Sequence, residues 1–171
     1  MARGSLPYAL IHGESLVACA AWALGEAEID LVDASVPWSG LAASGDDVVL
    51  HDALCPMTPP AFIRACLERS RETGRPVVGV RPVTDTVKVV SDGFVGETVD
   101  REGLLAVASP LVIPAAVAAT LTFPSHDLAR AVAELAAAGH RVEPLEAPPE
   151  GRRVSSAEAL RLLEALTDPR S

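Results

Sequence analysis

The hydrophobic and polar positions along the chain predict strands that alternate with helices. Runs of apolar and β-branched residues that are typical of strands lie at residues 8–11, 28–36, 48–50, 76–83, 104–110 and 140–147. Patterns with helical spacing lie at residues 16–27, 61–74, 125–138 and 155–166, and a further helix is expected after Pro114. Strands and helices in alternation predict an α/β fold with a mostly parallel sheet.

Several element ends carry local signals. Thr58 precedes two prolines, which predicts a threonine cap on the helix that Gly74 ends. Ser155 or Ser156 is expected to cap the last helix. Residues 38–45 (WSGLAASG) predict a loop or a single helical turn.

Residues 84–101 (TDTVKVVSDGFVGETVDR) predict a β-hairpin that projects from the domain. The dipeptide Asp92-Gly93 stands between two β-branched runs, and glycine tolerates the positive φ of a tight turn. This segment also carries Lys88, the only lysine of the chain. A two-stranded ribbon is marginally stable alone in water, so we expect a second surface to cover it.

Composition limits the class of protein. The 171 residues suit a single domain with its own core, since 49% of them are hydrophobic. A net charge of −9 argues against binding to nucleic acid or to an anionic membrane surface. The apolar runs are too short to cross a bilayer. Three cysteines without ligand spacing, and no signal peptide, predict a reducing cytoplasmic setting.

The candidate chemistry lies where predicted strands end, which is where ligands bind in parallel α/β sheets. His51 and Asp52 follow one such strand, and residues 81–85 end the next. A histidine there more often satisfies nearby backbone than acts as a base, and an aspartate often caps the following loop. No motif of an unrelated enzyme class is present.

Four segments, residues 49–56, 82–88, 98–110 and 150–160, follow the patterns VHDAARP, PVxDTxK, TVDRxxLxxxxTPQ and DNIKVTxPEDL in that order. They resemble the motifs of the 2-C-methyl-D-erythritol 4-phosphate cytidylyltransferases of isoprenoid biosynthesis. The resemblance covers roughly residues 46–166.

The resemblance implies a Rossmann-like nucleotidyltransferase sheet whose hairpin, residues 84–101, is an arm that embraces a second subunit of a homodimer. It also implies that Thr86, Lys88 and Arg101 on or beside the arm, together with Arg153, bind a sugar-phosphate. Asp52 matches the aspartate that assists a metal-bound triphosphate, so it is the candidate catalytic residue and Mg²⁺ ligand of an active enzyme. Charge on an arm is explained if the arm delivers it to an anion.

The departures from the family all fall on the nucleotide side of the site. Family members begin with a central strand and a glycine-rich loop whose amides cradle phosphates, followed by PKAL; here the expected lysine is Tyr8. The strand, the cytidine-binding GGxxRxxSV segment and the helix that normally precede HDA are reduced to residues 38–45. Cys55 replaces an arginine.

These departures favour a degenerate family member without transferase activity, which holds a small phosphorylated ligand at a dimer interface. One alternative is an active cytidylyltransferase with a reduced site that uses Arg3 and a metal on Asp52. Another is a structural partner that dimerises through its arm with a full-length paralogue. A start codon upstream of Met1 could encode the missing strand, although it would not restore the lysine.

Overall fold

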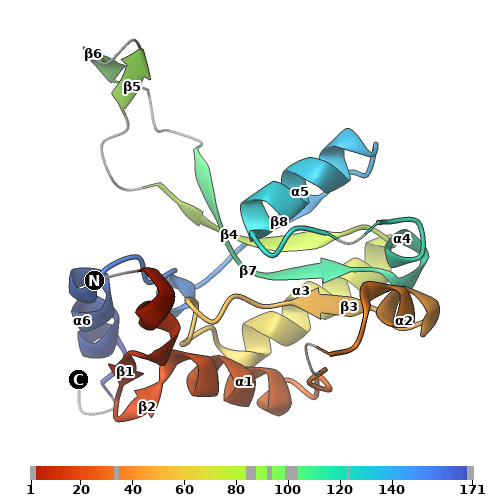
Figure 1. The fold of residues 1–171 in the computed structure, drawn as a ribbon, viewed down its shortest axis with the longest axis horizontal. Helices are drawn as coiled ribbons and strands as arrows, with labels where there is room; N and C mark the ends of the chain where they lie inside the picture. Colours follow the sequence, from red (N-terminus) through yellow and green to blue (C-terminus); the bar gives the residue numbers. More distant parts are fainter. Residues whose placement is uncertain are drawn as a thin grey trace.

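The chain folds around a four-stranded mixed sheet with helices on both faces (Figure 1). This computed structural model describes residues 3–32, 35–83, 88–91, 94–98, 104–122 and 124–168. Its strands are β1 (Leu10–Ile11), β2 (Glu14–Ser15), β3 (Val48–Leu50), β4 (Val77–Pro82), β5 (Lys88–Ser91), β6 (Phe94–Thr98), β7 (Leu105–Ile113) and β8 (Glu143–Glu146). Its helices are η1 (Arg3–Tyr8), α1 (Leu16–Glu26), α2 (Trp38–Ala43), α3 (Pro60–Thr73), α4 (Ala115–Ala118), α5 (Leu128–Ala137), η2 (Pro149–Gly151) and α6 (Ala157–Leu166).

The sheet has the order β3-β7-β4-β8, and three of its four strands run in the same direction. Strand β7 is reversed, so it pairs antiparallel with both β3 and β4, while β4 and β8 are parallel. The predicted mostly parallel α/β sheet is therefore confirmed in its strand directions. The reversed β7 was not predicted, and it brings the residues near Ser109 beside the end of β3.

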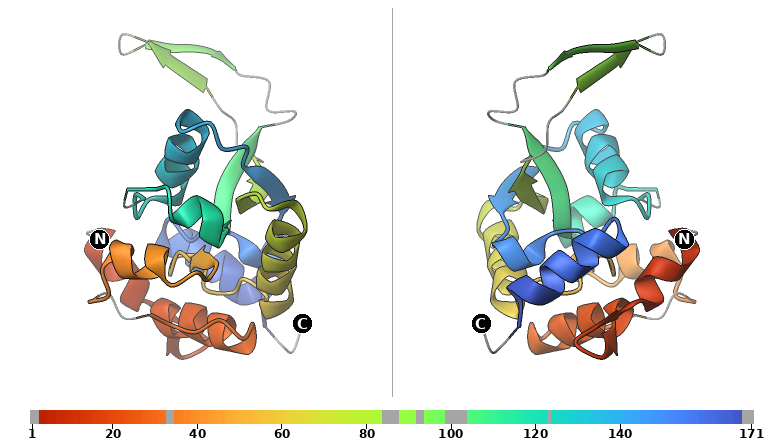
Figure 2. Two further views of the ribbon diagram at one scale, coloured as in Figure 1. Left: turned by 90° about the vertical axis from the view of Figure 1, so that its right-hand side faces the viewer. Right: turned by 90° about the vertical axis from the view of Figure 1, so that its left-hand side faces the viewer.

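Alternate residues of the central strands face different helices, which is why these strands are apolar along their length. Val78, Leu111 and Ile113 pack with α2, α4 and α5 on one face. Val77 and Val112 pack with Cys66 of α3 on the other. The views at right angles in Figure 2 show the helices on the two sides of the sheet.

Several element ends follow the expected local chemistry. Gly74 adopts the left-handed conformation, with φ of 65°, and ends α3 as predicted. Ser156 caps α6, since its side chain accepts a hydrogen bond from the main-chain N–H of Ala159. Thr58 is not a cap: Pro59 holds that position, and the Thr58 hydroxyl donates to the carbonyl of Cys55.

Three strand predictions need correction. Strand β7 continues through Pro110 to Ile113, because the prolyl residue lies in a pairing irregularity opposite Gly79 rather than at a strand end. The described part of residues 28–36 forms no strand, although its pattern is apolar. Tyr8 belongs to η1, and among the described strands β1 pairs with β2 alone, so residues 8–11 do not join the central sheet.

The predicted hairpin is present as an antiparallel pair of strands, β5 and β6, in a separate two-stranded sheet. Ser91, which the sequence places in a turn with Asp92 and Gly93, belongs to β5 and pairs with Phe94. The ribbon lies away from the central sheet, beyond the ends of β4 and β7 (Figure 1). Its role in dimerisation stays a prediction. None of the helices in the described ranges has the length and apolar character of a membrane span.

Candidate functional site

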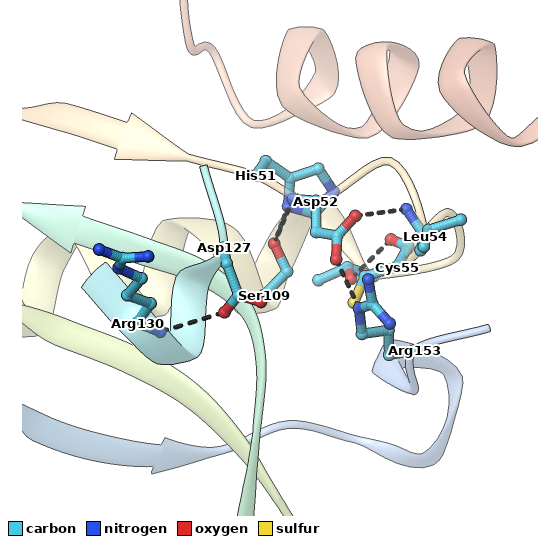
Figure 3. A network of polar contacts seen from close by, with 9 residues as sticks. His51, Asp52, Leu54, Cys55, Ser109, Asp127, Arg130 and Arg153 are labelled. Carbon is cyan, nitrogen blue, oxygen red and sulfur yellow. Dashed lines mark hydrogen bonds and ion pairs between the residues drawn. The ribbon is translucent and has the colours of Figure 1, made fainter. Parts of the chain in front are cut away.

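The candidate site lies where β3 ends and the chain enters the loop before α3. Figure 3 shows His51, Asp52, Ser109 and Arg153 converging there from three separate parts of the chain. The reversed β7 supplies Ser109, and the segment after η2 supplies Arg153. The main-chain N–H of Val154 donates to the carbonyl of Leu54 at 2.7 Å, which fixes the Arg153 segment against this loop.

The structure brings together two of the sequence-predicted site residues, Asp52 and Arg153. Arg153 Nε donates to Asp52 Oδ2 at 2.7 Å, and the main-chain N–H of Leu54 donates to Asp52 Oδ1 at 2.9 Å. Both carboxylate oxygens are therefore engaged within the chain. The side chains are 25% and 50% exposed, so the ion pair contributes no more than about 1 kcal/mol to stability.

The same arrangement bears on the expected Mg²⁺ ligand. A divalent cation at Asp52 would share the carboxylate with the Arg153 guanidinium, which donates to Oδ2. The described residues contain no group of three histidine, cysteine or acidic side chains that could hold a metal ion. As arranged here, Asp52 is the ion-pair partner of Arg153, and its role as a Mg²⁺ ligand stays a prediction.

Ser109 is a site residue that the sequence analysis did not single out. It is fully buried, and its Oγ lies 2.6 Å from His51 Nδ1 and accepts from the main-chain N–H of Asp52 at 3.0 Å. The Ser109 hydroxyl has one donor hydrogen and two acceptor lone pairs, so it can serve Asp52 and His51 at the same time, and the His51 tautomer decides which of Oγ and Nδ1 donates. The available signal was the match of Ser109 to the threonine of the family's TPQ segment.

His51 is a partly buried side chain that is neutral at pH 7. Burial lowers its pKa to about 4, although the negative charge of Asp52 opposes that shift. Its Nε2 atom is buried and has no hydrogen-bond partner among the described residues. From the sequence, His51 is expected to bond nearby backbone; its partner in the structure is instead the side-chain hydroxyl of Ser109.

The low pKa of His51 predicts a loss of stability in mild acid. The unfolded chain binds a proton near pH 6.5 and the folded chain only near pH 4, so stability is complete above about pH 7 and declines as the pH falls through this window. Between pH 7 and pH 5 the free energy of unfolding should fall by about 2 kcal/mol from this group. Urea denaturation at the two pH values measures it. His51→Gln should flatten the dependence and His140→Gln should not; equal slopes in all three proteins would contradict the assignment.

Cys55 stands where the family motif has an arginine, and it offers no equivalent chemistry. Its side chain is fully buried, and burial, with the negative charge of Asp52 second, raises the pKa of the thiol to about 12. At neutral pH such a thiol stays protonated, so it does not act as a nucleophile, and it cannot replace the positive charge of the arginine. Its main-chain N–H donates to the carbonyl of Asp52 at 2.8 Å, which makes Cys55 part of the turn.

The other predicted ligand residues belong to the arm. Lys88 begins β5 opposite Thr98, and the structure describes only its backbone. Thr86 and Arg101 lie outside the described residues. Their approach to Arg153 therefore stays a prediction.

Comparisons with known proteins agree on one family. The family model described as 2-C-methyl-D-erythritol 4-phosphate cytidylyltransferase (IspD) matches residues 33–151. A curated protein of that name from Nocardia farcinica is 37% identical over 141 residues, which cover 78% of this chain and 59% of the relative. Another, from Syntrophotalea carbinolica, is 42% identical over 69 residues, which cover 40% of this chain and 29% of the relative. The chain thus spans less than two thirds of these relatives.

Solved structures show the same fold. A crystal structure of a 4-diphosphocytidyl-2C-methyl-D-erythritol synthase superposes with a TM-score of 0.71 at 20% identity, covering 95% of each chain. The cytidylyltransferase from Thermus thermophilus superposes with a TM-score of 0.67 at 21% identity, covering 96% of this chain and 95% of the other. These similarities confirm the predicted Rossmann-like fold.

Proposed function

Because this chain belongs to the 2-C-methyl-D-erythritol 4-phosphate cytidylyltransferase family, we propose that it is a degenerate member that does not transfer a cytidylyl group by itself and binds a small phosphorylated ligand instead. The observation that carries the first half is the loss of two motif cations inside the described chain. Tyr8 stands where the family has a lysine, and Cys55, a fully buried thiol, stands where it has an arginine.

The electrostatics of the substrate support this proposal. A nucleoside triphosphate carries about four negative charges, and its transfer relies on preorganised amides and cations that contribute several kcal/mol each. Tyr8 replaces the expected lysine, and Cys55 replaces an arginine with a buried neutral thiol. Among the residues that the structure describes, Arg153 is the cation that pairs with Asp52, and its Nε already donates to that carboxylate.

The second half of the proposal rests on what Arg153 still offers. The side chain is half exposed and uses Nε for Asp52, so its terminal nitrogens face no second carboxylate within ion-pair distance in the described chain. A guanidinium with free donors is suited to a phosphate. In a homodimer, Arg101 and Thr86 on the arm of the other subunit would complete the site for a sugar-phosphate.

A turnover assay tests the loss of transfer. The purified chain is incubated with CTP, Mg²⁺ and 2-C-methyl-D-erythritol 4-phosphate, and pyrophosphate release is followed, with the Nocardia farcinica relative as the positive control. We expect no release above the enzyme-free blank. Release that Asp52→Ala abolishes would contradict the proposal and establish the alternative of an active enzyme with a reduced site.

Calorimetry tests the ligand. We expect titration of 2-C-methyl-D-erythritol 4-phosphate to give saturable heat with the wild type, and Arg101→Ala and Arg153→Gln each to weaken binding about tenfold or more, in line with the loss of a charge-assisted contact. Arg161→Gln, on the exposed side of α6, is the matched control and should bind as the wild type does. No heat from any sugar-phosphate with the wild type would remove the ligand half of the proposal. Light scattering that finds a monomer would remove the dimer.

A further inference from the structure

A second concave site lies apart from Asp52 and Arg153. It is a groove of about 610 Å³ between the β1–β2 turn, helix α1 and the segment before α3. Ile11 and Ala23 contribute apolar walls, and residues 56–60, which include three prolines, form another. The volume lies within the range of small-ligand pockets, which are also mostly apolar.

Trp22 lines this groove and is 63% exposed. The other tryptophan, Trp38, has the ordinary arrangement: it is buried, and its Nε1 donates to the carbonyl of Leu121 at 3.0 Å. An indole ring in the wall of an apolar groove offers its face to a ligand, and aromatic faces attract both flat apolar groups and cations.

Glu14 supplies charge to the same groove. Glu14 is one of the lining residues, and its side chain lies within ion-pair distance of no basic side chain in the described ranges. Cys19 also lines the groove. Burial raises the pKa of its thiol, and the negative charge of nearby Glu14 raises it further. His12, the other titratable side chain of the lining, has its Nε2 2.7 Å from the hydroxyl of Thr167.

We propose that this groove binds a small organic cation: a flat aromatic molecule that lies against Trp22 and carries one positive charge toward Glu14. Charge complementarity selects a cation, because Glu14 is the uncompensated charge of the lining and the whole chain has a net charge of −9. The volume and the largely apolar walls select an aromatic body of one or two rings. The site goes beyond the proposed function, since neither Asp52 nor Arg153 is among its lining residues.

Three probes of matched shape test the proposal by calorimetry: 1-naphthylmethylammonium, the neutral 1-naphthalenemethanol and the anionic 1-naphthoate. The cation should bind about fivefold or more tightly than the alcohol, and the anion more weakly than either, since an exposed carboxylate and an aromatic face each favour positive charge. Glu14→Gln should remove the difference between cation and alcohol. Glu28→Gln, beyond the other end of α1, should leave it unchanged.

Two further variants separate a built site from general apolar adsorption. Trp22→Ala should weaken all binding about tenfold or more, and Ala18→Leu, which fills the groove from the exposed side of α1, should abolish it. Circular dichroism should show both variants folded, because the two altered side chains are exposed. The proposal is overturned if no probe binds saturably, if the anion binds as tightly as the cation, or if folded Trp22→Ala binds like the wild type.

Discussion

Replacing Gly79 with alanine is expected to lower the free energy of unfolding by about 3 kcal/mol, as forced overpacking does in a tightly packed interior. A Cβ atom built at Gly79 would lie 2.6 Å from the carbonyl oxygen of Ser109 and 2.9 Å from its carbonyl carbon. Both are backbone atoms of the neighbouring strand, so the clash cannot be relieved by turning a side chain. Strands β4 and β7 would have to move apart at the centre of the sheet.

Gly25→Ala is the matched control for this substitution. Gly25 lies in α1, and a Cβ atom there would meet nothing within 4 Å, so the variant should be neutral or more stable by up to about 1 kcal/mol. Urea denaturation of both variants measures the difference. Equal stability of the two variants would show that β7 is not held as close to Gly79 as the structure places it.

Gly79→Ala should also affect the candidate site, because the strand it displaces carries Ser109. The Ser109 hydroxyl joins His51 to the main chain of Asp52, so a shift of β7 would separate those groups. The pH dependence assigned to His51 should therefore weaken in any Gly79→Ala protein that still folds. This link between sheet packing and site geometry exists because β7 is reversed.

The sequence was sufficient for the elements whose signals are local. The end of α3 at Gly74, a serine cap on α6 at position 155 or 156, and the hairpin of β5 and β6 each depend on a few adjacent residues, and each was predicted. The end of β7 at Ile113 was not predicted. Pro110 lies at a pairing irregularity opposite Gly79, and only the contacts between the two strands, which no local sequence pattern records, show that the strand can continue through it. The apolar run at residues 28–36 forms no strand in its described part, since strand formation needs a neighbouring strand as well as a pattern.

The candidate site was predictable in its residues and not in their arrangement. Motif resemblance pointed to Asp52 and Arg153, which are 101 positions apart, yet nothing in the sequence showed that they pair with each other. The same holds for Ser109, whose hydroxyl reaches His51 only because β3 and β7 are antiparallel neighbours. Trp22 and Glu14 were not singled out at all, because an exposed tryptophan and an unpaired acid can be recognised only once burial is known.

Leu163→Ala is expected to lower the free energy of unfolding by about 3 kcal/mol, whereas Leu162→Ala should change it by less than about 0.5 kcal/mol. Leu163 is fully buried and packs with Ile11, Leu16 and Val154, so its truncation leaves a cavity between α6 and the N-terminal elements. Leu162 is 57% exposed. The two variants remove the same atoms from adjacent positions of one helix, so helix propensity cancels in the comparison and only packing remains.

The Leu163 cavity would lie under the segment that carries Arg153, because Val154 belongs to the same cluster and its N–H holds Leu54. Leu163→Ala should therefore weaken sugar-phosphate binding as well as stability, while Leu162→Ala should leave both unchanged. Urea denaturation and calorimetry on the same two proteins give both quantities. Equal destabilisation by the two variants would mean that α6 does not pack through Leu163. The packing that places Arg153 against Asp52 would then be contradicted as well.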